Sequence, residues 1–145
     1  MLVLVIGPSG ESGTALLAGV RAALAGDDRF SFPRPQITRR ASGNPDSHEP
    51  VDRESFELRR AVGAYAMSWQ EDGIRYGIPA EIALDLDLGH IVVIAAAHAV
   101  IAEASRRFRV SVLESAAASP DAVATLVAEL RLLARQLDSV VSLPG

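Results

Sequence analysis

The stretch MLVLVI-GPSGESG-T, residues 1–14, decides the fold. Its first six residues are a short apolar run rich in branched side chains, and a turn with three glycines follows. After Thr14, apolar residues recur at helical spacing. A buried strand, a Gly-rich turn and a helix, in that order, form the context in which backbone N–H groups hold phosphate. The stretch therefore predicts an α/β domain with a phosphate-binding loop.

This loop lacks the cation of a working one. The pattern G-x-x-x-x-G-K-[ST] places its first glycine at Gly7, its second at Ser12, its lysine at Gly13 and its hydroxyl at Thr14. All 14 basic residues of the chain are arginines, so no lysine elsewhere can substitute, and Glu11 adds a negative charge. In a working loop the lysine reaches the β- and γ-phosphates. The predicted phosphate contacts are Gly7, Pro8, Ser9, Gly10, Ser12, Gly13 and Thr14.

Thr14 has two interpretations. Its hydroxyl would be a Mg²⁺ ligand if a nucleotide binds, as in other phosphate loops. Otherwise it caps the helix that follows. Three scattered histidines without short spacing predict no metal site of their own.

Composition narrows the class of protein. A chain of 145 residues with 49% hydrophobic and 22% charged residues predicts one globular domain. The net charge of -4 argues against sequence-independent nucleic-acid binding, which needs a basic face. No apolar run approaches the roughly 20 residues of a membrane-spanning helix, and the absence of cysteine excludes disulfides. We therefore expect a cytoplasmic protein without a membrane or nucleic-acid partner.

Strands and helices alternate along the chain. Helices are predicted at residues 14–25, at 51–61 with Asp52 as the N-cap, at 79–88, at 97–108 and at 120–137. Strands are predicted at residues 2–6, 33–38, 91–96, 109–114 and 139–143, and a hairpin joins 64–69 to 74–78 across the turn 71–73. Residues 39–50 are expected to form a loop. This alternation predicts a doubly wound parallel sheet.

Several segments, taken in order, resemble the guanylate-kinase-like P-loop kinases, in particular the ribose 1,5-bisphosphate phosphokinases of phosphonate catabolism. The segments are Gly7–Gly10, Gln36–Arg39, His48, Leu58–Trp69 and Gly73–Ile78. The resemblance covers residues 2–114 and implies one domain over 1–145 with a small substrate-side insertion at about 38–78. That family makes phosphoribosyl diphosphate with ATP.

The resemblance also implies which residues hold the substrate. Thr38 and Arg39 would hold an anionic phosphate, Tyr76 would close over it, and His48 would lie on the same loop. The arginine fork suits a phosphate group. The simpler alternatives are a solvated Arg39-Arg40 pair and an exposed His48. Tyr65 and Trp69 are predicted to lie in the core or to form a pocket wall.

The departures from the family fall on the nucleotide side. Gly13 replaces the loop lysine, and Ala95–His98 (AAAH) replaces a polar Asn-Gly-Ser-Arg stretch after a strand. Residues 120–137 are predicted as one uninterrupted helix where the family has an Arg-rich lid, so the lid is expected to be deleted. Arg131 and Arg135 are the arginines that remain near the end of that helix.

Three hypotheses follow. The first is a degenerate, catalytically impaired or inactive relative that retains phosphate or phosphosugar binding or serves in protein interaction, with no residue assigned as catalytic. The second is an active ATP- and Mg²⁺-dependent phosphokinase that uses Arg39, or a partner's arginine, in place of the lysine. The third is a structural subunit that dimerises through the C-terminal helix. The sequence leaves the true ligand, any partner and the oligomeric state open.

Overall fold

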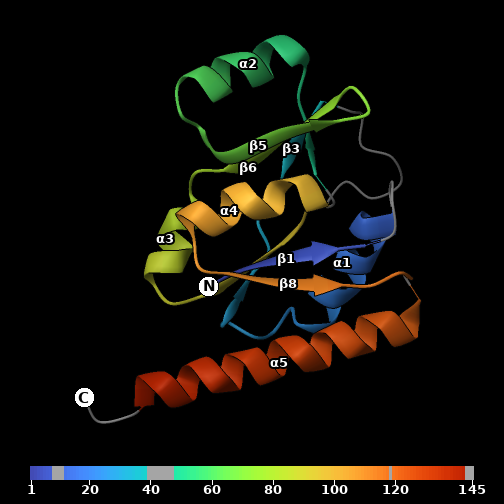
Figure 1. Ribbon diagram of the computed structural model, residues 1–145, viewed down its shortest axis with the longest axis vertical. Coiled ribbons are helices and arrows are strands. Elements are labelled where there is room, and N and C mark those ends of the chain that lie inside the picture. The colour runs from blue at the N-terminus through green and yellow to red at the C-terminus, as the bar shows by residue number, and fades with distance from the viewer. Residues whose placement is uncertain (8–11, 39–47, 118, 143–145) are drawn as a thin grey trace.

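The fold is built on a four-stranded parallel sheet. The computed structural model describes residues 1–7, 12–38, 48–117 and 119–142 (Figure 1). The strand order is β2-β7-β1-β8, and every neighbouring pair is parallel. The strands are β1 (Leu2–Ile6), β2 (Phe30–Ser31), β7 (Ile91–Ala95) and β8 (Val110–Glu114). The predicted parallel α/β fold is confirmed.

Strand β1 lies inside the sheet and separates two hydrophobic cores. All five of its residues are buried, and successive side chains of a strand point to opposite faces. Val3 and Val5 enter one core, and Leu2 and Leu4 enter the other. A continuous apolar run is therefore what this position requires, because both faces of a parallel sheet are covered.

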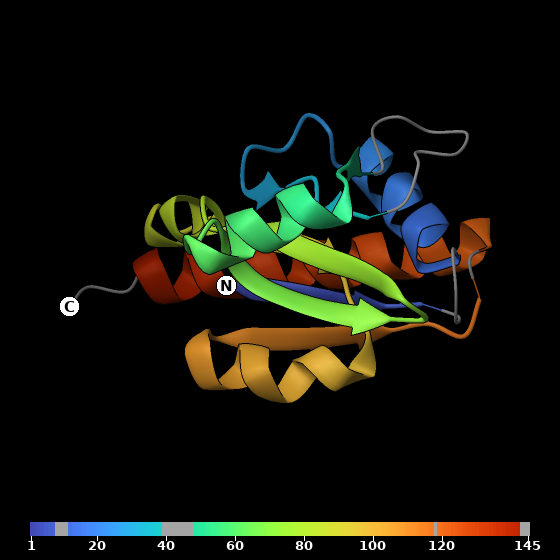
Figure 2. The ribbon, with the colours of Figure 1, turned by 90° about the horizontal axis from the view of Figure 1, so that it is seen from above.

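Two helices, α1 (Ser12–Ala23) and α5 (Pro120–Ser142), cover the first face. Leu16 and Val20 of α1 pack in the first core with Leu126 and Leu130 of α5. Helix α4 (Ile101–Arg107) covers the other face, after the 3-10 turn η1 (His98–Val100) (Figure 2). Helix α3 (Ile82–Asp87) adds Ile82 to the second core.

A second sheet packs on the face that holds the second core. Its order is β4-β3-β6-β5, with β3 (Gln36–Ile37), β4 (Glu49–Pro50), β5 (Tyr65–Glu71) and β6 (Ile74–Pro79). Met67 and Ile78 of this sheet are buried in the second core, together with Leu2 and Leu4. The β5–β6 hairpin turns at Asp72 and Gly73, which both have positive φ, 52° and 76°. The hairpin predicted around this Asp-Gly pair is confirmed.

Helix α2 (Arg53–Ala61) covers the outer face of the second sheet. Asp52 accepts the Ser55 N–H at 2.7 Å, so the predicted N-cap is confirmed. The Phe56 and Tyr65 rings lie 4.8 Å apart. On the neighbouring strand, a Cβ at Gly77 would lie 2.7 Å from the Tyr65 ring, so only glycine allows this close approach.

Some predicted boundaries were wrong, mostly at short elements. The strand predicted at 33–38 is reduced to β3, and Phe30–Ser31 forms a strand that the pattern did not indicate. Pro79 ends β6 instead of starting a helix, and the helix predicted at 97–108 is divided into η1 and α4. The predicted last strand is wrong for 139–142, since α5 continues to Ser142. Branched residues there suggested a strand, but a long helix already packed on the core propagates through them.

The described residues contain no helix long and apolar enough to cross a membrane.

Helix α4 is joined to the second sheet by a hydrogen bond. Arg107 of α4 donates to the Ala66 carbonyl of β5.

We predict that Asp27 contributes acid-sensitive stability. The Arg29 guanidinium, 2.6 Å from its carboxylate, lowers the pKa of Asp27 from 3.8 to about 2. A lowered folded-state pKa stabilises the fold above the unfolded value, and this contribution is lost as the pH falls from about 4 towards 2. Denaturant titrations at about pH 5 and about pH 2.5 should show a smaller acid loss for Asp27→Asn than for wild type. An equal loss in the two proteins would contradict this assignment.

Candidate functional site

The predicted phosphate loop joins β1 to α1. Gly7 follows the strand, while Ser12, Gly13 and Thr14 form the first residues of the helix. Pro8, Ser9, Gly10 and Glu11 lie outside the described residues. A helix N-terminus offers unpaired N–H groups and the positive end of the helix dipole to an anion. The start of α1 therefore offers N–H groups to an anion, although Gly13 provides no cation.

A carboxylate lies at the edge of the sheet where phosphate would bind. Ligands of open α/β sheets bind at the carboxyl ends of the strands. Strands β7 and β8 flank β1 and end at Ala95 and Glu114. His98 Nε2 is 2.6 Å from Glu114 Oε1, so the pair links the two strand ends on either side of β1. Sequence reasoning missed Glu114, because only the strand register brings it to His98.

The connection from β8 to α5 is short. Residues 115–119 join the two elements, and the Ser119 hydroxyl accepts the Ala122 N–H at 3.2 Å at the start of α5. Arg131 lies 11 residues into the helix, about 16 Å from its start. Arg131 also lowers the pKa of Asp27, which precedes β2 at the amino ends of the strands. It therefore lies towards the edge opposite the phosphate loop.

The predicted substrate residues are divided between the two faces of the second sheet. Tyr76 stacks on Trp69, with ring centroids 5.3 Å apart and planes 4° apart. Tyr76 and Ile78 are two positions apart on β6, so their side chains lie on the same face of the strand. Ile78 is buried in the second core. The Thr38 hydroxyl instead accepts the Arg75 N–H at 2.9 Å, on the other face of β6.

The structure contradicts the expectation that His48 is exposed. His48 was expected as an exposed loop residue in its simpler interpretation, but it is only 1% exposed. Its carbonyl accepts a hydrogen bond from Arg34 Nη2 at 3.0 Å, and β4 begins at the next residue. The pairing of β4 with β3 draws this residue inward. Arg39 lies outside the described residues.

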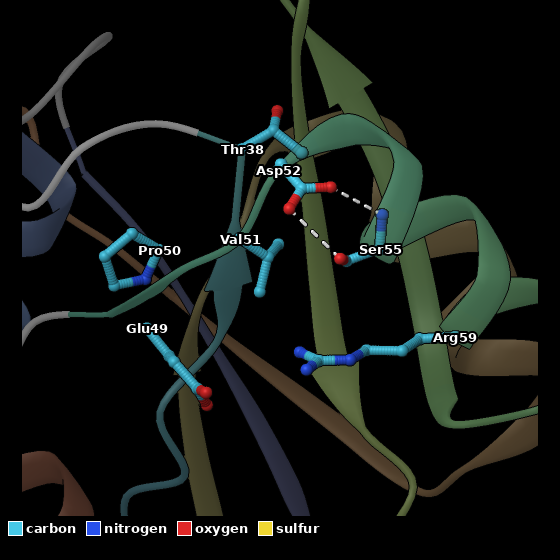
Figure 3. Close-up of a pocket in the computed structure, with 7 residues that line it drawn as sticks. All are labelled: Thr38, Glu49, Pro50, Val51, Asp52, Ser55 and Arg59. Atoms are coloured by element: carbon cyan, nitrogen blue, oxygen red, sulfur yellow. Dashed lines mark hydrogen bonds between the residues drawn. The ribbon is translucent and has the colours of Figure 1, made fainter.

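A pocket of about 430 Å³ opens between α2 and the strands β3 and β4 (Figure 3). Its lining residues are Thr38, Glu49, Pro50, Val51, Asp52, Ser55 and Arg59. Among the predicted substrate residues that the structure describes, Thr38 lines this pocket, whereas His48 and Tyr76 do not. Sequence reasoning missed Glu49, Ser55 and Arg59 as pocket residues. The spacing of Ser55 and Arg59, which places them on one helix face, was the available signal.

The described residues include no cluster of three or more His, Asp or Glu side chains that could hold a metal. The side chain of Thr14 is not among those described, so its role as a Mg²⁺ ligand stays a prediction.

Comparisons with known proteins bear on both chemistry and fold. No protein-family model matches the chain. It is 40% identical over 136 residues to a ribose 1,5-bisphosphate phosphokinase PhnN of Acidiphilium cryptum, covering 94% of this chain and 72% of that protein. A protein of the same name from Methylobacterium radiotolerans is 40% identical over 128 residues, covering 88% of this chain and 72% of that protein.

A solved structure agrees with the fold. A guanylate kinase from Anaplasma phagocytophilum superposes with a TM-score of 0.63 at 17% identity. The match covers 79% of this chain and 58% of that one. At this identity the likeness concerns the fold alone.

Proposed function

This chain belongs to the ribose 1,5-bisphosphate phosphokinase family, and we propose that it is a member with impaired phosphotransfer that still binds a phosphosugar. Kinases of this general type transfer a phosphoryl group by positioning it and by neutralising its charge. The proposal therefore depends on which charges and which binding surfaces this chain keeps.

The observation that carries the proposal is the charge at the nucleotide side. Gly13 occupies the lysine position in the first turn of α1, and no residue of the chain is a lysine. At the same edge of the sheet, the Glu114 carboxylate pairs with His98. Losing one contact that stabilises developing charge typically costs about 10²–10³-fold in rate. The short β8–α5 connection adds no arginine to replace it.

Phosphosugar binding rests on different features. The N-terminus of the 12-residue helix α1 still provides N–H groups for an anion. The stacked Trp69 and Tyr76 rings lie on the face of the second sheet that turns toward the parallel sheet. A rigid aromatic pair offers a flat apolar surface against which a sugar ring can pack.

An active phosphokinase is the second candidate, since 40% identity over 94% of the chain to a protein named as such a kinase favours it. In that case Arg39, or an arginine of a partner, would supply the missing charge. ATP and Mg²⁺ would then be the cosubstrate and metal.

Dimerisation through α5 stays a prediction. The apolar residues Leu126, Leu130 and Ala134 of this helix are already buried in the first core. Among the side chains of α5 that the structure describes, the large apolar group that is half exposed is Leu132, at 50%.

One paired measurement tests the proposal. We expect ribose 1,5-bisphosphate to bind in calorimetry, and we expect chromatography to show turnover at least about 10²-fold below the ~1 s⁻¹ lower end for kinases. The Acidiphilium cryptum relative serves as the positive control in the same assay. Turnover near ~1 s⁻¹ would establish the active kinase instead, whereas failure of the bisphosphate to bind would refute the retained site.

A further inference from the structure

The pocket beneath α2 is distinct from the face that carries Tyr76. Gln36 lies directly opposite Gly77 in the β3–β6 ladder, so the two share a face. The close approach of Gly77 to the Tyr65 ring, which packs on Phe56 of α2, makes that face the outer one. Ile78 and Tyr76 belong to the opposite face. A ligand in the pocket would therefore contact surfaces that the stacked Trp69–Tyr76 pair does not reach.

Arg59 is the charged anchor of this pocket. Its guanidinium reaches from α2 into the pocket, toward Val51 and Glu49 (Figure 3). Its Nη1 atom is buried and has no hydrogen-bond partner in the described part of the chain. Among those same residues, Arg59 and Glu49 line the same pocket without forming an ion pair with each other. The Tyr65 hydroxyl already interacts with the Arg59 side chain, but a buried N–H donor left without a partner is costly, and an incoming oxyanion would satisfy the Nη1 atom.

The polar groups around Arg59 are held in place by their own contacts. The Tyr65 hydroxyl donates to Gln36 Oε1 at 2.6 Å, and Gln36 Nε2 donates to Glu49 Oε2 at 3.1 Å. Ser55 occupies both oxygens of Asp52, through its backbone N–H and its hydroxyl. Asp52 is thus committed to the helix cap.

These contacts leave a defined set of donors and acceptors. A carboxylate has about four acceptor positions, so Glu49 can still accept from a ligand hydroxyl after binding Gln36. The Thr38 oxygen accepts the Arg75 N–H, which leaves its own O–H free to donate. The pocket therefore combines a cation, an acceptor carboxylate and a hydroxyl donor.

We propose that this pocket is a second ligand site, specific for a small oxyanion that also carries hydroxyl groups. The oxyanion would bind the Arg59 guanidinium, and a ligand hydroxyl would donate to Glu49. A phosphate ester of a sugar and a polyhydroxy carboxylate share this chemistry. The pocket's volume of about 430 Å³ accommodates either. This proposal does not depend on the phosphotransfer proposal, because none of the lining residues that the structure describes belongs to the phosphate loop.

Binding titrations on the intact chain test the proposal, with D-ribose 5-phosphate, D-gluconate, inorganic phosphate and D-ribose as probes. We expect the two hydroxylated oxyanions to bind more tightly than inorganic phosphate, and we expect D-ribose not to bind. Arg59→Met should weaken the binding of D-gluconate by about 10- to 100-fold, the usual loss for a hydrogen bond to a charged group. Tighter binding of D-ribose 5-phosphate or of D-gluconate decides which of the two anions the site prefers.

Arg60→Met is the matched control. Arg60 is the next residue of α2, its side chain is 55% exposed, and it pairs with Glu57 outside the pocket. The Arg60→Met substitution removes the same charge as Arg59→Met. We therefore expect the Arg60→Met variant to bind D-gluconate with the affinity of wild type. An equal loss in both variants would show general charge screening and overturn the proposal. The proposal would also be overturned if Arg59→Met binds as wild type does, or if no probe binds at millimolar concentration.

Two further measurements remain decisive if Arg59→Met does not fold. Backbone amide shifts of wild type with D-gluconate should change at residues 49, 51, 52 and 55, and changes confined to residues 12–14 would place the ligand on α1 instead. Glu49→Gln should lower the ratio of the affinity for D-ribose 5-phosphate to the affinity for inorganic phosphate. The reason is that a neutral amide replaces the carboxylate that accepts a hydrogen bond from the ligand hydroxyl. An unchanged preference would contradict the role of Glu49.

Discussion

Gly13→Lys is expected to raise the affinity for ATP about 10- to 100-fold, because one charge-assisted contact contributes roughly 1.5–3 kcal/mol. It is expected to leave turnover at least about 10²-fold below the ~1 s⁻¹ of a slow kinase. The new ammonium group would meet the phosphates, but Ala95 and Ala97 would still lack polar side chains, and Glu114 would still present a carboxylate. Calorimetry with ATP and chromatography of the product measure the two effects separately.

Gly13→Met is the control for this variant. Gly13 lies within α1, and replacing a helical glycine stabilises a helix by up to about 1 kcal/mol whatever the charge of the new residue. The Met variant should share that gain in stability without gaining affinity for ATP. Robust phosphotransfer by Gly13→Lys alone would show that the nucleotide side is otherwise intact and would refute the proposed impairment.

Phe56→Ala is expected to lower the free energy of unfolding by about 3–5 kcal/mol, the usual cost of truncating a buried aromatic side chain. Phe56 is 1% exposed and its ring packs against Tyr65. This contact fixes α2 on the second sheet, so its loss removes a large part of the 5–15 kcal/mol that typically stabilises a domain. Denaturant titration with far-UV circular dichroism measures the change.

Leu58→Ala is the matched control in the same helix. Leu58 is 64% exposed, so its truncation should change the stability by less than about 0.5 kcal/mol. If both variants lose equal stability, the burial of Phe56 would not explain the loss, since alanine favours a helix at either position, and the assigned anchoring role of Phe56 would be wrong.

Local signals were enough to predict most of the framework. The run Leu2–Ile6 indicated a strand covered on both faces, and it is fully buried. Asp52 and the pair Asp72-Gly73 indicated a helix cap and a hairpin turn, and both are present. Each of these features depends on residues within a few positions of one another, so each can be recognised without the rest of the fold.

The strands of two residues could not be predicted in the same way. Strand β3 was predicted, but with longer bounds. Strands β2 and β4 are too short for any hydrophobic alternation, and they exist because a neighbouring strand pairs with them. The same pairing places His48 in the interior, next to β4, where the sequence around it suggested an exposed loop. The end of α5 was misjudged for a related reason, since packing on the core overrides the strand preference of branched residues.

The composition and order of motifs in this chain thus established its fold class, its family resemblance and the missing cation, because these depend on residue identity and on short spacing. The electrostatics of its sites depended on long-range contacts. His98 meets Glu114 across 16 positions because two parallel strands flank β1 in register. Arg59 faces Glu49 because α2 folds back over β4. Such contacts follow from strand register and helix docking, which are fixed only when the whole core assembles.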